Sequence, residues 1–167
     1  MKKLEFLVLH CTATPKGRAV SREDIIRWHT SPKEKGGRGW KQVGYSDMIC
    51  VDGRLVNLIP YNEDDVVDPW EISNGAPGFN SKSRHAVYAG GMDEKNKKPE
   101  DTRTDAQKQT MERYVKNMIA LHPQIKILGH RQAAGAEGKA CPSFDVPFWL
   151  KSIGVPDVNI YGAAIKK

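Results

Sequence analysis

The chain has 167 residues, a length that favours one domain with its own buried core. With 39% hydrophobic and 28% charged residues, its composition is typical of a globular protein and speaks against disorder, and no apolar run approaches the roughly 20 residues that a membrane helix needs. The formal net charge of +6 indicates an anionic partner such as nucleic acid, a membrane surface or a bacterial cell wall, unless the scattered Lys and Arg only solvate the surface.

The first residues carry two Lys before an apolar run, as a signal peptide does. The run from Leu4 to Leu9 contains Glu5 and is too short for a signal h-region, which has roughly 7–15 residues. We therefore interpret it as a strand and expect the protein to be made in the cytoplasm without an export signal. Three cysteines in that setting argue against a disulfide framework and leave at least one as a candidate metal ligand or nucleophile.

Hydrophobic periodicity and turn signals predict an α/β domain. Ser21 and Thr104 are suitable N-caps for two helices, and Asp52-Gly53 is a tight hairpin turn. Strands are expected over 4–10, 45–51, 54–59, 85–89 and 125–128, and helices over 22–30, 105–121 and 146–152. The prediction is a single domain over residues 1–155, with a central mixed sheet of about five strands, one antiparallel hairpin and about three flanking helices, followed by a C-terminal tail at 156–167.

Three residues are candidate metal ligands. His10 ends the first expected strand, His130 follows the last one, and Cys141 lies in the segment before the last helix. Strand ends bring side chains to one edge of an α/β sheet, where sites form. Two imidazoles and a thiolate suit Zn²⁺, and three protein ligands are the number found in catalytic zinc sites. The spacing alone does not establish a zinc site. Each His could also have a structural or surface role, and Cys141 could be a buried thiol that packs as a small hydrophobic side chain.

Four short motifs, in this order, resemble those of one family. They are Val8–Thr14 (VLHCTAT), Val43–Tyr45 followed by Asp52-Gly53, Gly129–Arg131, and Lys139–Asp145 (KACPSFD). Together they resemble the N-acetylmuramoyl-L-alanine amidases of the phage-endolysin and peptidoglycan-recognition-protein superfamily (amidase type 2). The chain departs from the family pattern at Ser46 and Asp47, in the strand 83–88, and in a longer segment before Cys141.

The resemblance implies zinc-dependent hydrolysis of the amide bond between N-acetylmuramic acid and L-alanine in peptidoglycan. It implies that His10, His130 and Cys141 bind Zn²⁺ and that Tyr45 and Lys139 assist catalysis. The residues alone favour a packing role for Tyr45 at a strand start and a solvated side chain for Lys139.

Further candidates lie near the expected groove. Trp70 and Asn80 belong to a long irregular segment, a kind of loop that is often functional, and His85 begins the next strand. We expect these three to contact substrate, although packing within the loop explains Trp70 and Asn80 equally well. Asp47 is expected either to orient a ligand imidazole or, in preference, to form a salt bridge within the hairpin.

Two rival functions remain at this stage. A non-catalytic peptidoglycan-binding relative is expected to lack a ligand, typically the cysteine, and Cys141 is present. A basic nucleic-acid binder is the other, but no helix-turn-helix or zinc-finger pattern occurs, and no stable nucleic-acid complex is expected. We expect a monomer with no membrane span, cytoplasmic until it is released to act on the bacterial cell wall, as an endolysin or a secreted effector would.

Overall fold

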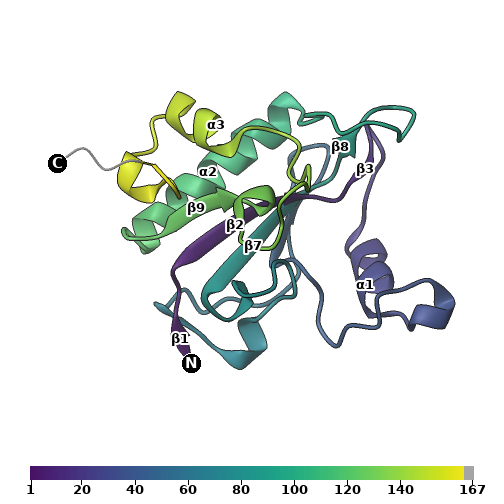
Figure 1. Ribbon diagram of the computed structural model, residues 1–167, viewed down its shortest axis with the longest axis horizontal. Helices are drawn as coiled ribbons and strands as arrows, with labels where there is room; N and C mark the ends of the chain where they lie inside the picture. Colours follow the sequence, from purple (N-terminus) through teal and green to yellow (C-terminus); the bar gives the residue numbers. More distant parts are fainter. Residues whose placement is uncertain (164–167) are drawn as a thin grey trace.

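A five-stranded mixed sheet forms the centre of the protein (Figure 1). The computed structural model describes residues 1–163. In spatial order the strands are β5 (Leu55–Asn57), β4 (Asp47–Ile49), β7 (Ser83–Tyr88), β2 (Phe6–Cys11) and β9 (Lys126–Gly129). All neighbours are parallel except β5, which forms an antiparallel hairpin with β4. The predicted mixed sheet with one hairpin is confirmed.

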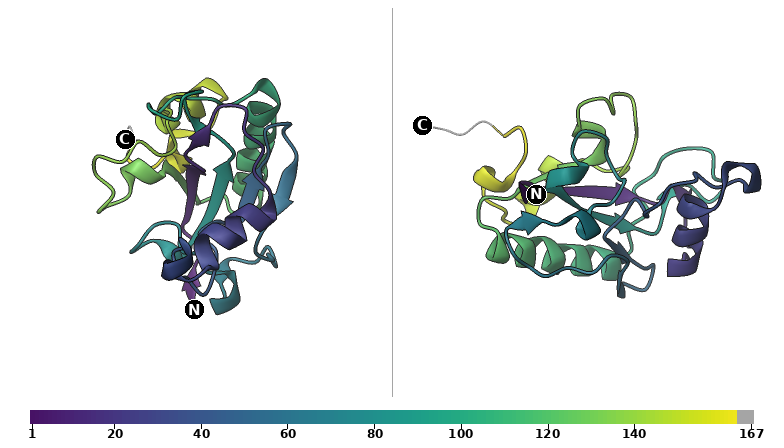
Figure 2. Two further views of the ribbon diagram at one scale, coloured as in Figure 1. Left: turned by 90° about the vertical axis from the view of Figure 1, so that its right-hand side faces the viewer. Right: turned by 90° about the horizontal axis from the view of Figure 1, so that it is seen from below.

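The three expected helices are α1 (Arg22–Thr30), α2 (Asp105–Leu121) and α3 (Val146–Ser152). Ser21 and Thr104 cap α1 and α2 as predicted, because their hydroxyl oxygens accept hydrogen bonds from the third backbone N–H of each helix, at 3.1 and 3.0 Å. Helices α2 and α3 lie close together, whereas α1 lies apart from them (Figures 1 and 2). The predicted single α/β domain with three helices is confirmed within residues 1–163.

Strand alternation divides the core into two faces. Leu7 and Leu9 of β2 share one cluster with Tyr88 of β7 and with buried residues of α2 and α3. Val8 lies on the other face, in a smaller cluster built by irregular segments, while Ile25 of α1 packs near β4 and β7 on the same side. Successive side chains point to opposite faces, so His10 and Val8 share the face that α2 and α3 do not cover.

Several short elements carry no sequence signal. Two-residue strands pair β1 (Lys2–Lys3) with β6 (Val66–Val67) and β3 (Thr14–Pro15) with β8 (Gly91–Met92). The expected strand over 45–51 is reduced to β4, since the Ser46 carbonyl accepts bonds from two successive amides, of Leu58 and Ile59, rather than a regular ladder. The 3₁₀ helices are η1 (Lys33–Lys35), η2 (Pro69–Glu71), η3 (Asn80–Lys82), η4 (His130–Gln132) and η5 (Asp157–Asn159).

The segment 156–163 packs on the sheet edge at β9. The Tyr161 amide donates to the carbonyl of Ile127 at 3.0 Å, and Ile160 is buried. The Asn159 side-chain amide donates to the carbonyls of Pro123 and Ile125, both at 2.9 Å. The described part of the expected tail is therefore bound to the domain, and residues 164–167 lie outside the described residues. Within residues 1–163, the structure has no helix with the length and apolar character needed to cross a membrane.

Candidate active site

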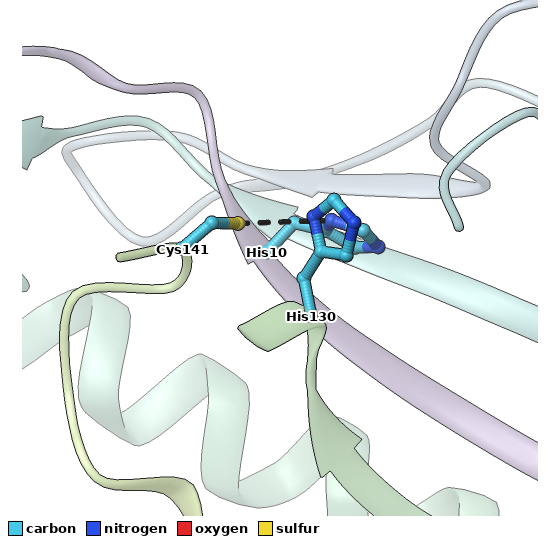
Figure 3. Close-up of side chains that lie close together, drawn as sticks. All are labelled: His10, His130 and Cys141. Atoms are coloured by element: carbon cyan, nitrogen blue, oxygen red, sulfur yellow. Dashed lines mark hydrogen bonds between the residues drawn. The ribbon is translucent and has the colours of Figure 1, made fainter. Parts of the chain in front are cut away.

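His10, His130 and Cys141 meet at one end of the sheet (Figure 3). Each offers one ligand atom, and these three atoms lie within 4.8 Å of one another. Cys141 Sγ lies 3.8 Å from His10 Nδ1. The structure thus brings together the three residues that the sequence singled out as candidate metal ligands.

Strand register explains how the two imidazoles meet. Strands β2 and β9 are parallel neighbours, and Leu9 is paired with Gly129. His10 follows Leu9 and His130 follows Gly129, so the two imidazoles lie side by side at the carboxyl edge of the sheet. This is the edge at which α/β proteins bind ligands. Their ring centroids lie 4.7 Å apart.

Three hydrogen bonds fix Cys141 beside them. The Arg131 amide donates to the carbonyl of Cys141 at 2.9 Å, which ties the residue after His130 to the second ligand segment. The Tyr88 hydroxyl donates to the carbonyl of Pro142 at 2.7 Å, and the amide of Cys11 donates to Cys141 Sγ at 3.3 Å. The segment between these ties, residues 132–140, projects from the domain (Figure 2).

Burial governs the charge of these groups. It lowers the pKa of His10 well below its usual value, with smaller contributions from His85 and His130, and it lowers the pKa of His130 with help from Lys139. Both imidazoles are therefore neutral near pH 7, with lone pairs free to bind a metal. A hydrogen bond from Cys141 lowers the pKa of Cys11 to about 7, while this bond and burial raise that of Cys141. A cation between the ligand atoms would instead favour the Cys141 thiolate.

The donor set fits a zinc ion. Tetrahedral Zn²⁺ with bonds of about 2.0–2.3 Å places nitrogen and sulfur ligands roughly 3.3–3.8 Å apart. The 3.8 Å between Cys141 Sγ and His10 Nδ1 matches this spacing. His10 Nε2 is engaged by His85 at 2.8 Å, which leaves Nδ1 as the nitrogen that faces the metal position. We conclude that His10, His130 and Cys141 are suited to hold Zn²⁺.

A groove of about 210 Å³ opens in front of His10 and His130. Tyr45 and Lys139, the two expected catalytic residues, both line it. The Tyr45 ring lies 5.2 Å from that of His10, centroid to centroid, and burial raises the pKa of its phenol above the usual range, so the phenol carries its proton near pH 7. Lys139 is close enough to lower the pKa of both imidazoles, which places its positive charge beside the candidate metal position.

The expected substrate residues are dispersed. His85 is fully buried behind His10 and offers no surface to the groove. Trp70, in η2, is 47% exposed and is not among the groove-lining residues. Asn80, in η3, lines an adjacent depression together with Trp40, while its Oδ1 accepts from the amide of Ala76 at 2.8 Å. Contact with substrate stays a prediction for Trp70 and Asn80, whereas the full burial of His85 contradicts the expectation that it contacts substrate.

Asp47 does not approach the metal group. Its carboxylate forms a buried ion pair with Arg84 at 3.2 Å and accepts from the Tyr114 hydroxyl at 2.6 Å and from Asn57 at 2.8 Å. Asn57 belongs to the hairpin, but the charged partner lies on β7. The carboxylate therefore fixes β4 to its neighbours and does not orient a ligand imidazole.

The sequence reasoning assigned no role to several residues of the groove lining, among them His29, Arg38 and Trp40. His29 lies one helical turn after Ile25, and this spacing was the available signal that it faces inward. Its Nδ1 accepts from the amide of Gly44 at 2.9 Å. Arg38 lies over the Trp40 ring at 5.0 Å, a contact formed by an irregular glycine-rich segment that no periodicity reveals.

An α/β sheet whose carboxyl edge carries a candidate metal group, with a groove in front of it, is an arrangement typical of α/β enzymes. The family model described as N-acetylmuramoyl-L-alanine amidase matches residues 1–144. The chain belongs to the N-acetylmuramoyl-L-alanine amidase family, and the resemblance drawn from its four motifs is confirmed.

Related sequences agree with this assignment, and solved structures share the fold. The chain is 31% identical over 144 residues to an endolysin of Enterobacteria phage K11, covering 86% of this chain and 83% of that protein. It is 30% identical over 143 residues to an endolysin of Escherichia phage T7, with the same coverage of 86% and 83%. An N-acetylmuramoyl-L-alanine amidase of Clostridium intestinale shares the fold, with a TM-score of 0.67 at 18% identity over 92% of this chain and 87% of that one. Bumblebee PGRP-SA does so with a TM-score of 0.67 at 15% identity, over 98% and 87%.

Proposed function

We propose that the protein hydrolyses the amide bond between N-acetylmuramic acid and L-alanine in peptidoglycan, and that it does so with a Zn²⁺ ion held by His10, His130 and Cys141. The observation that carries the proposal is the convergence of these three ligand atoms within 4.8 Å, at the mouth of a groove, in a chain of this family. The phage relatives are endolysins, which supports a role in cell-wall lysis. Release from the cytoplasm to the wall is part of the same proposal.

The bound ion would lower the pKa of a water molecule to about 7 and polarise the amide carbonyl. The remaining chemistry belongs to the chain. Lys139 lines the groove with a positive charge, which suits it to stabilise the oxyanion that develops when the carbonyl is attacked. Tyr45 presents a protonated phenol to the same groove, and it can donate a hydrogen bond to the reacting oxygen.

Cysteine substitution tests the metal centre. In Cys141→Ala we expect loss of bound zinc and of activity, measured by metal analysis and by mass spectrometry of digested sacculi, with the fold retained by circular dichroism. Cys50→Ala is the matched control, because Cys50 is a buried thiol in a separate cluster, and it should keep zinc and activity. Full activity in Cys141→Ala would overturn the proposed site, and activity that survives a strong chelator in the wild-type protein would overturn its metal dependence.

Lys139→Ala tests the oxyanion role separately. The ammonium is not a ligand, so we expect zinc content to stay at the wild-type level. Turnover should fall by about 10²–10³, the loss typical of one oxyanion-stabilising group. Unchanged turnover would remove Lys139 from the mechanism while leaving the metal centre intact.

A further inference from the structure

His85 lies directly behind His10. Its Nδ1 is 2.8 Å from His10 Nε2, the nitrogen that faces away from the candidate metal position. The side chain is fully buried, and the ring centroids lie 5.1 Å apart. The two imidazoles therefore form a pair that leads from the metal position into the interior.

The direction of this hydrogen bond follows from the tautomers. When His10 Nδ1 binds a metal, its Nε2 carries the hydrogen and donates it. His85 Nδ1 must then accept, and the hydrogen of neutral His85 is on its own Nε2. That Nε2 is buried and has no hydrogen-bond partner among residues 1–163.

An unpartnered buried polar atom destabilises the folded state, because it has lost its hydrogen bonds to water and gained none in return. An apolar side chain of similar size would avoid this cost, so stability of the core does not account for an imidazole at this position. The contact that uses the polar character of His85 is its bond to His10.

The surroundings hold the ring in place. Ser46 binds the backbone of His85 on both sides: the Ser46 amide donates to the His85 carbonyl at 2.7 Å, and the His85 amide donates to the Ser46 hydroxyl at 3.0 Å. On the groove side, Gly75 contributes no side chain, and a Cβ there would lie 2.4 Å from His85 Nδ1 and 2.7 Å from His85 Cγ. The His85 ring thus packs directly against the backbone of Gly75, and its own backbone is fixed to that of Ser46.

We propose that His85 is a positioning residue that accepts the Nε2 hydrogen of His10 and so holds His10 Nδ1 toward the metal. This inference rests on the proposed zinc centre. Ligand imidazoles usually donate their second N–H to a carboxylate, a carbonyl or water, and loss of such a partner typically weakens metal affinity. In this chain a second imidazole takes that place.

Two nearly isosteric substitutions test the bond. Asn offers an amide oxygen close to the position of His85 Nδ1, and Leu offers none. In a competition assay with a chromophoric chelator we expect His85→Leu to bind zinc about 10- to 100-fold more weakly than the wild type. His85→Asn should restore affinity to within about threefold, since it restores the acceptor. Cobalt substitution should show altered d–d bands in His85→Leu but near wild-type bands in His85→Asn.

His122→Leu is the matched control. His122 is also a buried imidazole with two partners, Tyr61 and Asp65, but it lies at the end of α2, away from the groove. It should lose stability and keep wild-type zinc affinity. Wild-type affinity in His85→Leu, or equal weakness in His85→Asn and His85→Leu, would overturn the positioning role.

One measurement needs no variant. Long-range ¹⁵N–¹H NMR of the zinc-loaded wild-type protein should show His10 protonated on Nε2 and His85 protonated on Nε2 only. A hydrogen on His85 Nδ1 would overturn the inference even if every variant failed to fold. A wild-type protein that binds no zinc would overturn the proposed metal centre itself, so the two failures are distinguishable.

Discussion

Gly75→Ala should alter the position of the candidate ligand His10, although Gly75 contacts none of the three candidate metal ligands itself. The φ angle of Gly75 is not in the left-handed region, so alanine is allowed there by the backbone, and any cost is steric. The new Cβ would lie 2.4 Å from His85 Nδ1 and 2.7 Å from both His85 Cγ and the Gly44 carbonyl oxygen, whereas ordinary contacts begin at 3.4 Å. The His85 ring must therefore move by about 1 Å, and a shift of that size away from His10 would stretch their 2.8 Å bond beyond about 3.5 Å, the limit of a hydrogen bond.

The expected cost combines two terms. Overpacking typically costs about 1–3 kcal/mol and a lost hydrogen bond about 0.5–1.5 kcal/mol, so the free energy of unfolding should fall by about 2–4 kcal/mol. Zinc affinity should fall as well, since His10 loses its partner. Urea unfolding of the metal-free protein measures the first effect, and chelator competition measures the second.

A double-mutant cycle decides whether the ring carries the clash. His85→Ala removes the ring, so Gly75→Ala should cost less in that background, by at least about 1 kcal/mol. Strictly additive losses in stability would refute the reasoning, because they would place the clash at Gly44 alone. Unchanged zinc affinity in Gly75→Ala would show that the His10–His85 bond survives the substitution.

Three further variants test other parts of the site. Asp47→Asn leaves the buried Arg84 unpaired and should cost about 3–5 kcal/mol in urea unfolding, yet leave zinc affinity unchanged; weaker zinc binding would contradict the purely structural role. Burial lowers the pKa of His29 to about 4, from 6.5 in the unfolded chain. Between these two pH values the imidazole is protonated in the unfolded state but not in the folded state, so the free energy of unfolding falls as the pH drops from 6.5 to about 4. His29→Asn should therefore remove about 2–3 kcal/mol of the loss in stability between pH 7.5 and 4.5, and an unchanged pH dependence would exclude His29 as its source. Tyr45→Phe should keep zinc and lower kcat by about 10²-fold or more, and wild-type kcat would exclude a role for the phenol.

The metal group was predictable because strand ends are visible in sequence. His10 and His130 each come at the end of a short apolar run, which predicts a strand. If these two strands are parallel, both imidazoles lie at the same edge of the sheet. Cys141 needed the family motif, because nothing in its local pattern indicates that the segment folds back to His10. Helices α1 and α2 were predictable from Ser21 and Thr104, whose side chains cap them.

What the sequence did not reveal depends on contacts between distant segments. The role of His85 needs the register of β7 against β2, and the space that Gly75 leaves, neither of which is a local property. Trp40 reaches the groove through an irregular glycine-rich segment. Residues 156–163 have no periodicity, yet two hydrogen bonds fix them beside β9: the Asn159 side-chain amide donates to the carbonyl of Ile125, and the Tyr161 amide donates to that of Ile127.

The hydrogen bond from the Arg131 amide to the Cys141 carbonyl holds the candidate ligands His130 and Cys141 together independently of the segment 132–140 that connects them. Because this backbone bond closes the projecting stretch at its base, residues 132–140 can change in length with little effect on the distance between His130 and Cys141. The entropy of closing such a stretch grows only slowly with its length. Insertions there should reshape the rim from which Lys139 reaches the groove, while the spacing of the candidate metal ligands stays constant.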